Sequence, residues 1–193
     1  MRKSLLSVLV LAAIGSGAAN ATVTDAMLEG KDTKSVLNWG MTRDGQRFST
    51  LNKINDKNVN KLVPAWSMSF GGEKQRGQES QPLIHNGKMF VTASYSRIFA
   101  VDSKTGQKLW KYEHRLPDGI MPCCDVINRG AALYDNLVIF GTLDAQIVAL
   151  DQNTGKVVWK ETVDDFKAGY SMSAAPLIAN GLVITGEIGR AHV

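Results

Sequence analysis

The sequence contains an internal repeat that limits the folds open to the chain. When the chain is shifted by 49 positions, residues 83–110 align with residues 132–159 without a gap. A third, shorter copy begins at Pro176, and a degenerate earlier one ends at Trp66. The matched positions of the two full copies include Ala100, Asp102, Thr105, Gly106 and Trp110, which correspond to Ala149, Asp151, Thr154, Gly155 and Trp159. Such a period is typical of repeat proteins, in which each unit buries its faces against its neighbours.

Each repeat unit consists of short apolar runs separated by turn residues. Asn86-Gly87 and Asn180-Gly181 are typical of tight hairpin turns, and Gly106 and Gly155 stand where a turn requires a positive φ. About four strands per unit and a period of 44–49 residues predict a β-propeller. We therefore expect an all-β fold, a partial propeller of about three blades.

A tryptophan ends each unit, at positions 66, 110 and 159. One small sheet cannot bury both of its faces alone, so large aromatic side chains at this spacing are suited to the space between sheets. We expect Trp66, Trp110 and Trp159 to wedge between neighbouring sheets and to bury on the order of 200 Å² each. This interpretation makes the tryptophans architectural rather than catalytic.

The two cysteines of the chain, Cys123 and Cys124, are neighbours. Consecutive Cα atoms lie about 3.8 Å apart, whereas an ordinary disulfide spans roughly 4.4–6.8 Å. A bond between them would close a strained ring that encloses no loop, so it would stabilise the fold little but would form a rigid, flat plate. Adjacency alone leaves two alternatives, a vicinal disulfide or two reduced thiols in the core.

The first 21 residues are typical of a secretory signal peptide. Arg2 and Lys3 precede an apolar run, and Ala19-Asn20-Ala21 fits a small-residue cleavage site. We expect cleavage after Ala21 and, because no cysteine lies near it, no lipid anchor. Export would place the chain in a compartment that permits disulfides.

Charge and histidine spacing argue against two classes of function. The net charge of +4 falls to +2 once Arg2 and Lys3 are removed, and the remaining charges are scattered. We therefore expect no nucleic-acid partner. His85, His114 and His192 lie far apart, without the spacing of a metal site.

The repeated motif A-x-D-x-x-T-G-x-x-x-W resembles the tryptophan-docking motif of pyrroloquinoline quinone (PQQ) repeats. Non-catalytic propellers, such as an outer-membrane assembly scaffold, share that motif. The segments between the copies are more specific: residues 76–82 (RGQESQP), 94–97 (SYSR) and 114–130 (HRLPDGIMPCCDVINRG) resemble PQQ-dependent alcohol dehydrogenases, and the periplasmic ethanol dehydrogenases above all. The resemblance covers residues 36–186.

The resemblance implies a cofactor site. In that family PQQ lies near the axis of an eight-bladed propeller, between a tryptophan and a vicinal disulfide, which would be Cys123–Cys124 here. Glu79 and Arg129 correspond to residues that hold the polar edge of PQQ. Ser173 stands where the family has a threonine hydroxyl. Asp125 is interpreted as a local brace of the turn rather than a base.

The resemblance also implies an activity, the oxidation of an alcohol to an aldehyde or ketone with PQQ and a bound Ca²⁺ or lanthanide ion. Electrons would pass to a periplasmic cytochrome c, and a homodimer is compatible with the family. The catalytic base and most metal ligands are expected beyond residue 186, so no catalytic residue is assigned within the chain. The alternatives are a non-catalytic PQQ-repeat scaffold of the cell envelope and a PQQ sugar dehydrogenase, for which Cys123-Cys124 is not expected.

The last residues depart from the family pattern. After Gly186 the resemblance predicts a segment like x-S-G-G-E-F-G, but the chain continues as EIGRAHV, a string that common sequencing-adapter DNA would encode. We therefore expect three parts: a signal peptide over residues 1–21, the N-terminal part of a propeller domain over residues 22–186, and a non-native tail over residues 187–193.

Overall fold

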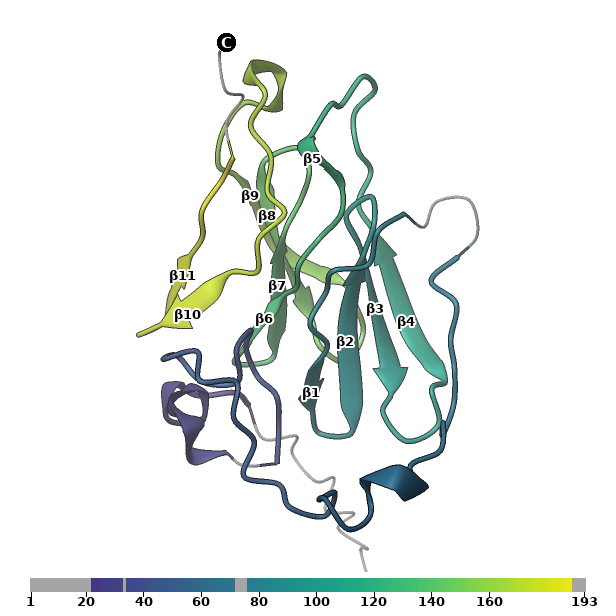
Figure 1. Cartoon of the computed structure of the whole chain (residues 1–193). Coiled ribbons are helices and arrows are strands. Elements are labelled where there is room, and N and C mark those ends of the chain that lie inside the picture. The colour runs from purple at the N-terminus through teal and green to yellow at the C-terminus, as the bar shows by residue number, and fades with distance from the viewer. Residues whose placement is uncertain (1–21, 33, 72–75, 189–193) are drawn as a thin grey trace, which may run out of the picture.

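The computed structural model describes residues 22–32, 34–71 and 76–188. It contains two four-stranded antiparallel sheets and a two-stranded hairpin that stand next to one another (Figure 1). Blade 1 has the order β1-β2-β3-β4, blade 2 has the order β6-β7-β8-β9, and β10 pairs with β11. The strands are β1 (Leu83–His85), β2 (Lys88–Ala93), β3 (Arg97–Asp102), β4 (Lys108–Glu113), β6 (Ala132–Tyr134), β7 (Leu137–Gly141), β8 (Gln146–Asp151), β9 (Val157–Thr162), β10 (Leu177–Ala179) and β11 (Leu182–Ile184).

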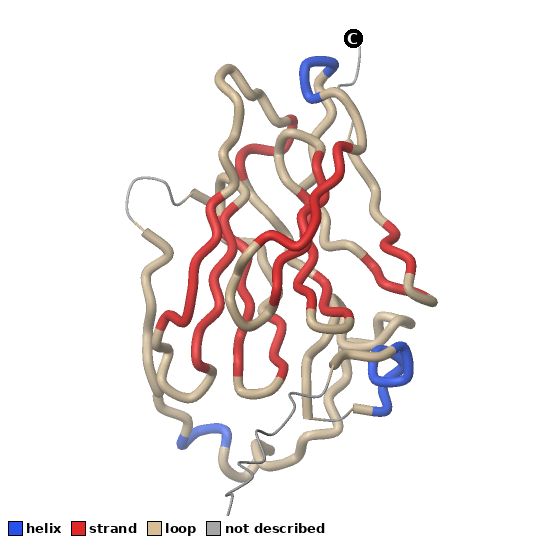
Figure 2. Tube along the Cα trace, turned by 180° about the vertical axis from the view of Figure 1, so that it is seen from behind, coloured by secondary structure: helices blue, strands red, loops and turns tan. Residues whose placement is uncertain are grey.

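The remaining elements lie outside these sheets. Strand β5 spans Cys123–Val126, and three short helices span Met27–Lys31, Val59–Lys61 and Phe166–Ala168. Seen from behind in Figure 2, the helices lie at the periphery of the strands. This arrangement confirms the predicted all-β partial propeller. No helix in the described ranges has the length and apolar character needed to cross a membrane. The predicted signal peptide, residues 1–21, and the last five residues of the predicted tail lie outside the described residues.

The core lies between the blades. Strands β2, β3, β7 and β8 are mostly buried, whereas the outermost strands β4 and β9 are exposed except for half-buried aromatic residues, Trp110 and Tyr112 in β4 and Trp159 in β9. This pattern follows from a sheet whose outer edge faces water. One apolar cluster spans both blades, and its largest fully buried side chains include Phe90, Ile98, Leu133, Phe140 and Leu150.

An aspartate organises the turn before the outermost strand of each blade. Asp102 Oδ1 accepts hydrogen bonds from the Thr105 backbone N–H at 2.8 Å and from its hydroxyl at 2.9 Å. Asp151 does the same for Thr154, at 2.7 and 2.8 Å. The hydrogen bonds from Thr105 lower the pKa of Asp102 from its ordinary value. The two turns are therefore built alike, as the repeat predicts.

The tryptophans dock on these turns in the neighbouring sheet. Trp66 donates from Nε1 to the Ser103 carbonyl oxygen at 3.2 Å, and a Cβ added to Gly106 would come within 2.5 Å of its ring. Trp110 of blade 1 likewise contacts Gly155 of blade 2 so closely that a Cβ there would lie 2.6 Å away. The glycines are needed for this close approach and for their positive φ. The predicted wedging is confirmed for these two tryptophans. Trp159 packs half-buried against the core cluster.

The segment after residue 21 connects the inner strands of the blades. Val36 pairs with Ile84 of β1, and Val23 pairs with Asp135 next to β6. Near the third hairpin, Arg43 forms an ion pair with Asp25 and donates from Nε to the Ile178 carbonyl oxygen at 3.2 Å.

In Figure 1 this purple segment lies at the lower end of the sheets, and β5 lies at the upper end. The lower ends of the inner strands are therefore covered by the chain itself.

Candidate cofactor-binding site

Three of the predicted cofactor residues occupy equivalent places in successive blades. Glu79 precedes β1, Arg129 precedes β6 and Ser173 precedes β10, each by three or four residues. The inner strands of adjacent blades start at the same end of the propeller. Residues just ahead of them are therefore brought together, although 44 to 50 positions separate them in sequence.

Arg129 lies at the centre of this trio. Its Nε lies 3.1 Å from Glu79 Oε2, and its Nη1 donates to Ser173 Oγ at 2.7 Å. The Arg129 side chain is 40% exposed and that of Glu79 is 48% exposed, whereas Ser173 is buried. Within the described part of the chain, Arg129 Nη2 and Glu79 Oε1 have no hydrogen-bond partner. The trio thus keeps the Nη2 nitrogen as a donor group and Glu79 Oε1 as an acceptor for a ligand.

Backbone hydrogen bonds join the three segments that carry the trio. The Arg129 N–H donates to the Ser173 carbonyl oxygen at 2.8 Å, and the Gln81 N–H donates to the Arg129 carbonyl oxygen at 3.2 Å. The buried Asn128 side chain donates to the Gly141 carbonyl oxygen at 2.9 Å. The backbone of Arg129 is therefore fixed to the preceding blade, to the following hairpin and to its own sheet.

The residues that flank Glu79 are fixed to strand β2. Gln78 Nε2 donates to the Thr92 carbonyl oxygen at 2.8 Å, and the Thr92 hydroxyl donates to Ser80 Oγ at 2.9 Å. Glu79 stands between these two anchored residues. Its carboxylate therefore projects from a fixed backbone, as a preformed site requires.

Cys123 and Cys124 begin strand β5, at the upper end of the sheets in Figure 1. Their side chains lie outside the described part of the structure, so the disulfide remains a prediction. The next residue, Asp125, has a φ of +62°, and its Oδ1 accepts a hydrogen bond from the Val126 N–H at 2.8 Å. Its Oδ2 lies 3.3 Å from Arg76 Nη2. Asp125 therefore makes local contacts from within β5, of the kind expected for a structural brace.

Comparison with known proteins identifies the family of this fold. A model of the family described as "PQQ: Glucose/ethanol/alcohol dehydrogenase, beta-propeller domain" matches residues 37–192. The chain belongs to this family of PQQ dehydrogenase propellers.

Three known proteins illustrate the similarity. Quinoprotein alcohol dehydrogenase PedH of Pseudomonas putida is 55% identical over 186 residues, which cover 95% of this chain and 31% of PedH. Quinoprotein ethanol dehydrogenase of Pseudomonas aeruginosa is 55% identical over 182 residues, which cover 92% of this chain and 29% of that protein. The solved structure of a europium-containing methanol dehydrogenase aligns with a TM-score of 0.78 at 35% identity, covering 84% of this chain and 29% of that one. The chain thus spans about three tenths of the length of these relatives.

The chemistry of the trio fits PQQ, which is planar and carries three carboxylates and an o-quinone. A carboxylate next to Glu79 alone would be repelled. The structure places the Arg129 guanidinium against Glu79, so the cation offsets the acid and still offers Nη2 to a ligand. The Ser173 hydroxyl, held by Nη1, completes a polar edge.

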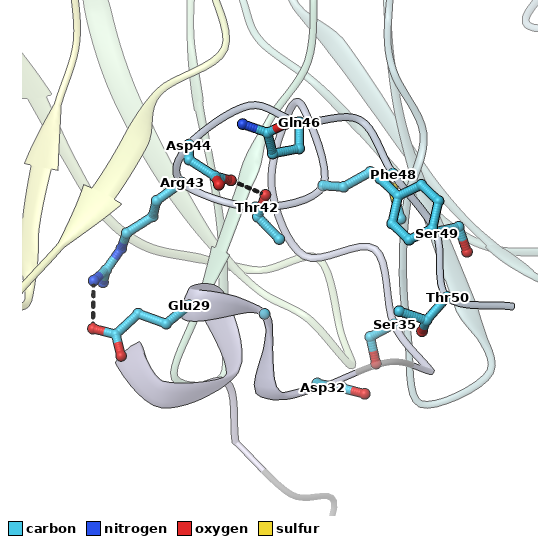
Figure 3. A pocket seen from close by; sticks show the side chains of 12 residues that line it. Glu29, Asp32, Ser35, Thr42, Arg43, Asp44, Gln46, Phe48, Ser49 and Thr50 are labelled. Carbon is cyan, nitrogen blue, oxygen red and sulfur yellow. Dashed lines mark hydrogen bonds and ion pairs between the residues drawn. The ribbon is translucent and has the colours of Figure 1, made fainter.

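A metal centre is not visible in residues 22–32, 34–71 and 76–188, where no cluster of three or more His, Cys, Asp or Glu side chains could hold an ion. A separate cavity of about 390 Å³ lies in the N-terminal segment (Figure 3). Arg43 and Glu29 in its wall form an ion pair at 3.0 Å, and Thr42 donates to Asp44. Glu79, Arg129 and Ser173 do not line this cavity. Glu29 and Asp44 in this cavity therefore make contacts within the N-terminal segment itself.

Sequence reasoning missed a buried polar network between the two blades. His114 Nε2 lies 2.9 Å from Asp144 Oδ2, and both side chains are only 4% exposed. Burial by itself raises the pKa of Asp144. Hydrogen bonds from His114 and Thr142 outweigh that effect and hold the pKa below its ordinary value. One signal was available: under the 49-residue shift, His114 aligns with Val163 and Asp144 with Tyr95. The network therefore stands where the two repeats differ.

Proposed function

We propose that this chain is the N-terminal part of the propeller of a quinoprotein alcohol dehydrogenase, which oxidises an alcohol to an aldehyde or ketone. The proposal adds PQQ and a Ca²⁺ or lanthanide ion as cofactors. In this assignment the chain supplies part of the cofactor site, and the catalytic base and most metal ligands belong to the rest of the enzyme.

One observation carries the proposal. In a chain of this family, a half-exposed arginine is held between a carboxylate and a buried hydroxyl, each from the start of a different blade. A structural ion pair at the surface contributes only about 0–1 kcal/mol, so stability alone gives little reason to align these three residues. A ligand that all three residues contact at the propeller axis would explain why they are aligned.

Each residue of the site has a defined task in this proposal. Arg129 would pair with a PQQ carboxylate through Nη2, while Glu79 and Ser173 keep its guanidinium in place. Cys123 and Cys124, bonded to each other, would form a flat surface against the rings. When bound, PQQ would supply the electron-accepting quinone, and the metal ion would supply a Lewis acid.

The proposal extends to the surroundings of the enzyme. The apolar run and cleavage pattern of residues 1–21 support export to the periplasm. There a cytochrome c would accept the electrons, a small alcohol would be the substrate and a homodimer would be compatible with the fold. N-terminal sequencing of the exported protein should begin at Thr22.

Reconstitution of the full-length protein tests the function. We expect the apo-protein to bind PQQ with a change in cofactor absorbance and, with Ca²⁺ or a lanthanide ion, to oxidise ethanol with an artificial electron acceptor. Lys111→Ala is the matched control for Arg129→Ala, because Lys111 and Glu113 form a similarly half-exposed ion pair on β4. Failure of the wild-type protein to bind PQQ would favour the scaffold alternative. Equal PQQ affinity in Arg129→Ala and Lys111→Ala would show that Arg129 does not belong to the cofactor site.

A further inference from the structure

The loop over residues 115–122 connects blade 1 to the two cysteines. Within the described part of the chain, these eight residues form no hydrogen bond or ion pair to any other element. Met121 near its end is 79% exposed. Four other residues of the loop are half-buried: Leu116, Pro117, Ile120 and Pro122. Without hydrogen bonds of its own, the loop takes its position from this packing and from its two ends. The residues that hold those ends therefore help to decide where Cys123 and Cys124 lie.

His114 forms the first end of the loop. Its backbone N–H donates to the Ser96 carbonyl oxygen at 3.2 Å. Its Nε2 lies 2.9 Å from Asp144 Oδ2, and because a carboxylate can only accept, Nε2 carries the proton. The Tyr112 hydroxyl lies 3.2 Å from Nδ1. Backbone and ring are thus both held, in a buried environment where hydrogen bonds are strong.

Asp144 is itself fixed, in the turn between β7 and β8 of blade 2. Its Oδ1 accepts a hydrogen bond from the Thr142 hydroxyl at 2.6 Å, and its Oδ2 accepts a second one from Gln146 Nε2 at 2.9 Å. The backbone N–H of Leu143 in the same turn donates to Ser96 Oγ at 2.9 Å. His114 is therefore fastened to a rigid part of the neighbouring blade.

The same turn also contacts the segment that carries Ser173. The Met172 N–H donates to the Thr142 carbonyl oxygen at 3.1 Å. A Cβ added to Gly141 would come within 2.7 Å of the Met172 side chain, so the two segments are tightly packed. The β7–β8 turn is therefore a common support for the cysteine loop and for the hydroxyl that holds Arg129.

The second end of the loop, at strand β5, is held by a surface ion pair and by a backbone hydrogen bond. Arg76 and Asp125 form an ion pair at 3.3 Å, but both side chains are about half exposed, and such pairs contribute little. The Tyr95 N–H also donates to the Val126 carbonyl oxygen at 2.9 Å. Val126 is itself buried, so both ends of the loop are anchored, and His114 is the anchor whose side chain joins the loop to blade 2.

We propose that His114 and Asp144 are positioning residues that fix the cysteine loop relative to Ser173 and Arg129. The link to the cofactor rests on the proposed function. His114 and Asp144 act through the loop and contact neither the cofactor nor the substrate. A brace that only joined blades 1 and 2 would stabilise the fold without affecting the loop, and this difference can be measured.

Limited trypsin digestion of the full-length apo-protein tests the fastening of the loop. Arg115 is the sole trypsin site within residues 115–122. We expect His114→Ala to speed cleavage after Arg115 about tenfold to hundredfold relative to cleavage after Lys104, in the opposite turn of blade 1. This range corresponds to the loss of one hydrogen bond to a charged group. His114→Gln, which can keep a donor near the Nε2 position, should restore most of the protection.

His85→Ala is the matched control, because His85 is also a buried histidine of blade 1 but lies at the end of β1 away from the loop. It should leave the cleavage ratio within about twofold of wild type, a limit well below the effect of one hydrogen bond. Equal acceleration at Arg115 and Lys104, or the same ratio in the two alanine variants, would overturn the proposal.

Cofactor dissociation tests the second step. PQQ release from the reconstituted protein, followed by absorbance without any substrate, should be faster in His114→Ala than in His85→Ala. Unchanged release combined with rapid cleavage at Arg115 would show that the loop does not position the cofactor, and would also overturn the proposal. If the wild-type protein binds no PQQ, the proposed function fails, and the digestion ratio still decides whether His114 fastens the loop.

Discussion

Two acid–base pairs lie near the same end of the blades, and their surroundings differ sharply. Arg129 and Glu79 are 3.1 Å apart with side chains 40% and 48% exposed, whereas His114 and Asp144 are 2.9 Å apart and 4% exposed. Asp144 uses both oxygens for partners inside the protein. Within the described residues, Glu79 and Arg129 each retain an unpaired polar atom.

This difference separates two uses of a polar pair in one fold. A buried pair whose groups are all satisfied holds segments together, and its loss leaves a desolvated group without a partner. A half-exposed pair contributes little to folding but can present a preformed charge pattern to a ligand. The comparison therefore predicts opposite consequences when each pair is broken.

The largest effect is expected from Asp144→Ala. This change leaves the buried His114 ring and the half-buried Gln146 amide without this acceptor, and the Thr142 hydroxyl keeps only the Gln146 carbonyl oxygen. We therefore expect a loss of roughly 2–5 kcal/mol in the free energy of unfolding. Urea denaturation of the full-length apo-protein would measure it. Glu79→Ala is the matched change in the exposed pair and should cost less than about 1 kcal/mol. Similar losses in both variants would contradict the comparison.

Arg129→Ala should weaken cofactor binding and leave the stability of the apo-protein almost unchanged. An arginine paired with a buried ligand charge is worth about 2–5 kcal/mol of binding free energy, so PQQ affinity should fall by that amount. The thermal midpoint of the apo-protein should change little, because the Arg129–Glu79 pair is half exposed. Titration with PQQ and melting of the apo-protein provide the two measurements. A collapsed apo-protein that keeps normal cofactor affinity would make Arg129 a structural residue.

The sequence was sufficient to predict the blades, the docking tryptophans and the three residues that converge. The A-x-D-x-x-T-G-x-x-x-W motif contains its own turn chemistry, because Asp102 and Gly106 act within a few residues of each other. Glu79, Arg129 and Ser173 could be found because each lies ahead of an inner strand in a segment that resembles the family.

The parts that could not be predicted depend on contacts between blades. His114 and Asp144 are 30 positions apart in different repeat units, and no spacing rule links them. Arg43 finds Asp25 and the Ile178 carbonyl oxygen only after three inner strands have been placed side by side. Such partners are set by tertiary packing, so a search for local motifs does not find them.

Acid should weaken the buried pair. The folded-state pKa of Asp144 is lowered from its ordinary value of 3.8. Its contribution to stability is therefore complete above the unfolded-state pKa and is lost as the pH falls through the lower, folded-state pKa. We expect the stability difference between wild type and Asp144→Asn to be constant near pH 7 and to shrink below about pH 4. Urea midpoints over that range measure it, with the exposed loop variant Asp118→Asn as control. If the stability difference between wild type and Asp144→Asn grew as the pH fell, the pKa of Asp144 would be raised in the folded state rather than lowered.

The smallest effect on stability is expected from reduction of Cys123–Cys124. In the exported protein, mass spectrometry without reduction should show the tryptic peptide of residues 116–129 lighter by two hydrogens than its dithiol form, whereas two alkylatable thiols would exclude the bond. A disulfide between neighbours encloses no loop, so its contribution lies near the bottom of the roughly 0–5 kcal/mol range known for disulfides. Reduction of the apo-protein should therefore barely shift its thermal midpoint. PQQ affinity should nevertheless fall, because a flat surface becomes two mobile thiols. A large drop in the thermal midpoint with unchanged PQQ affinity would show that the cysteines stabilise the fold and do not contribute to cofactor binding.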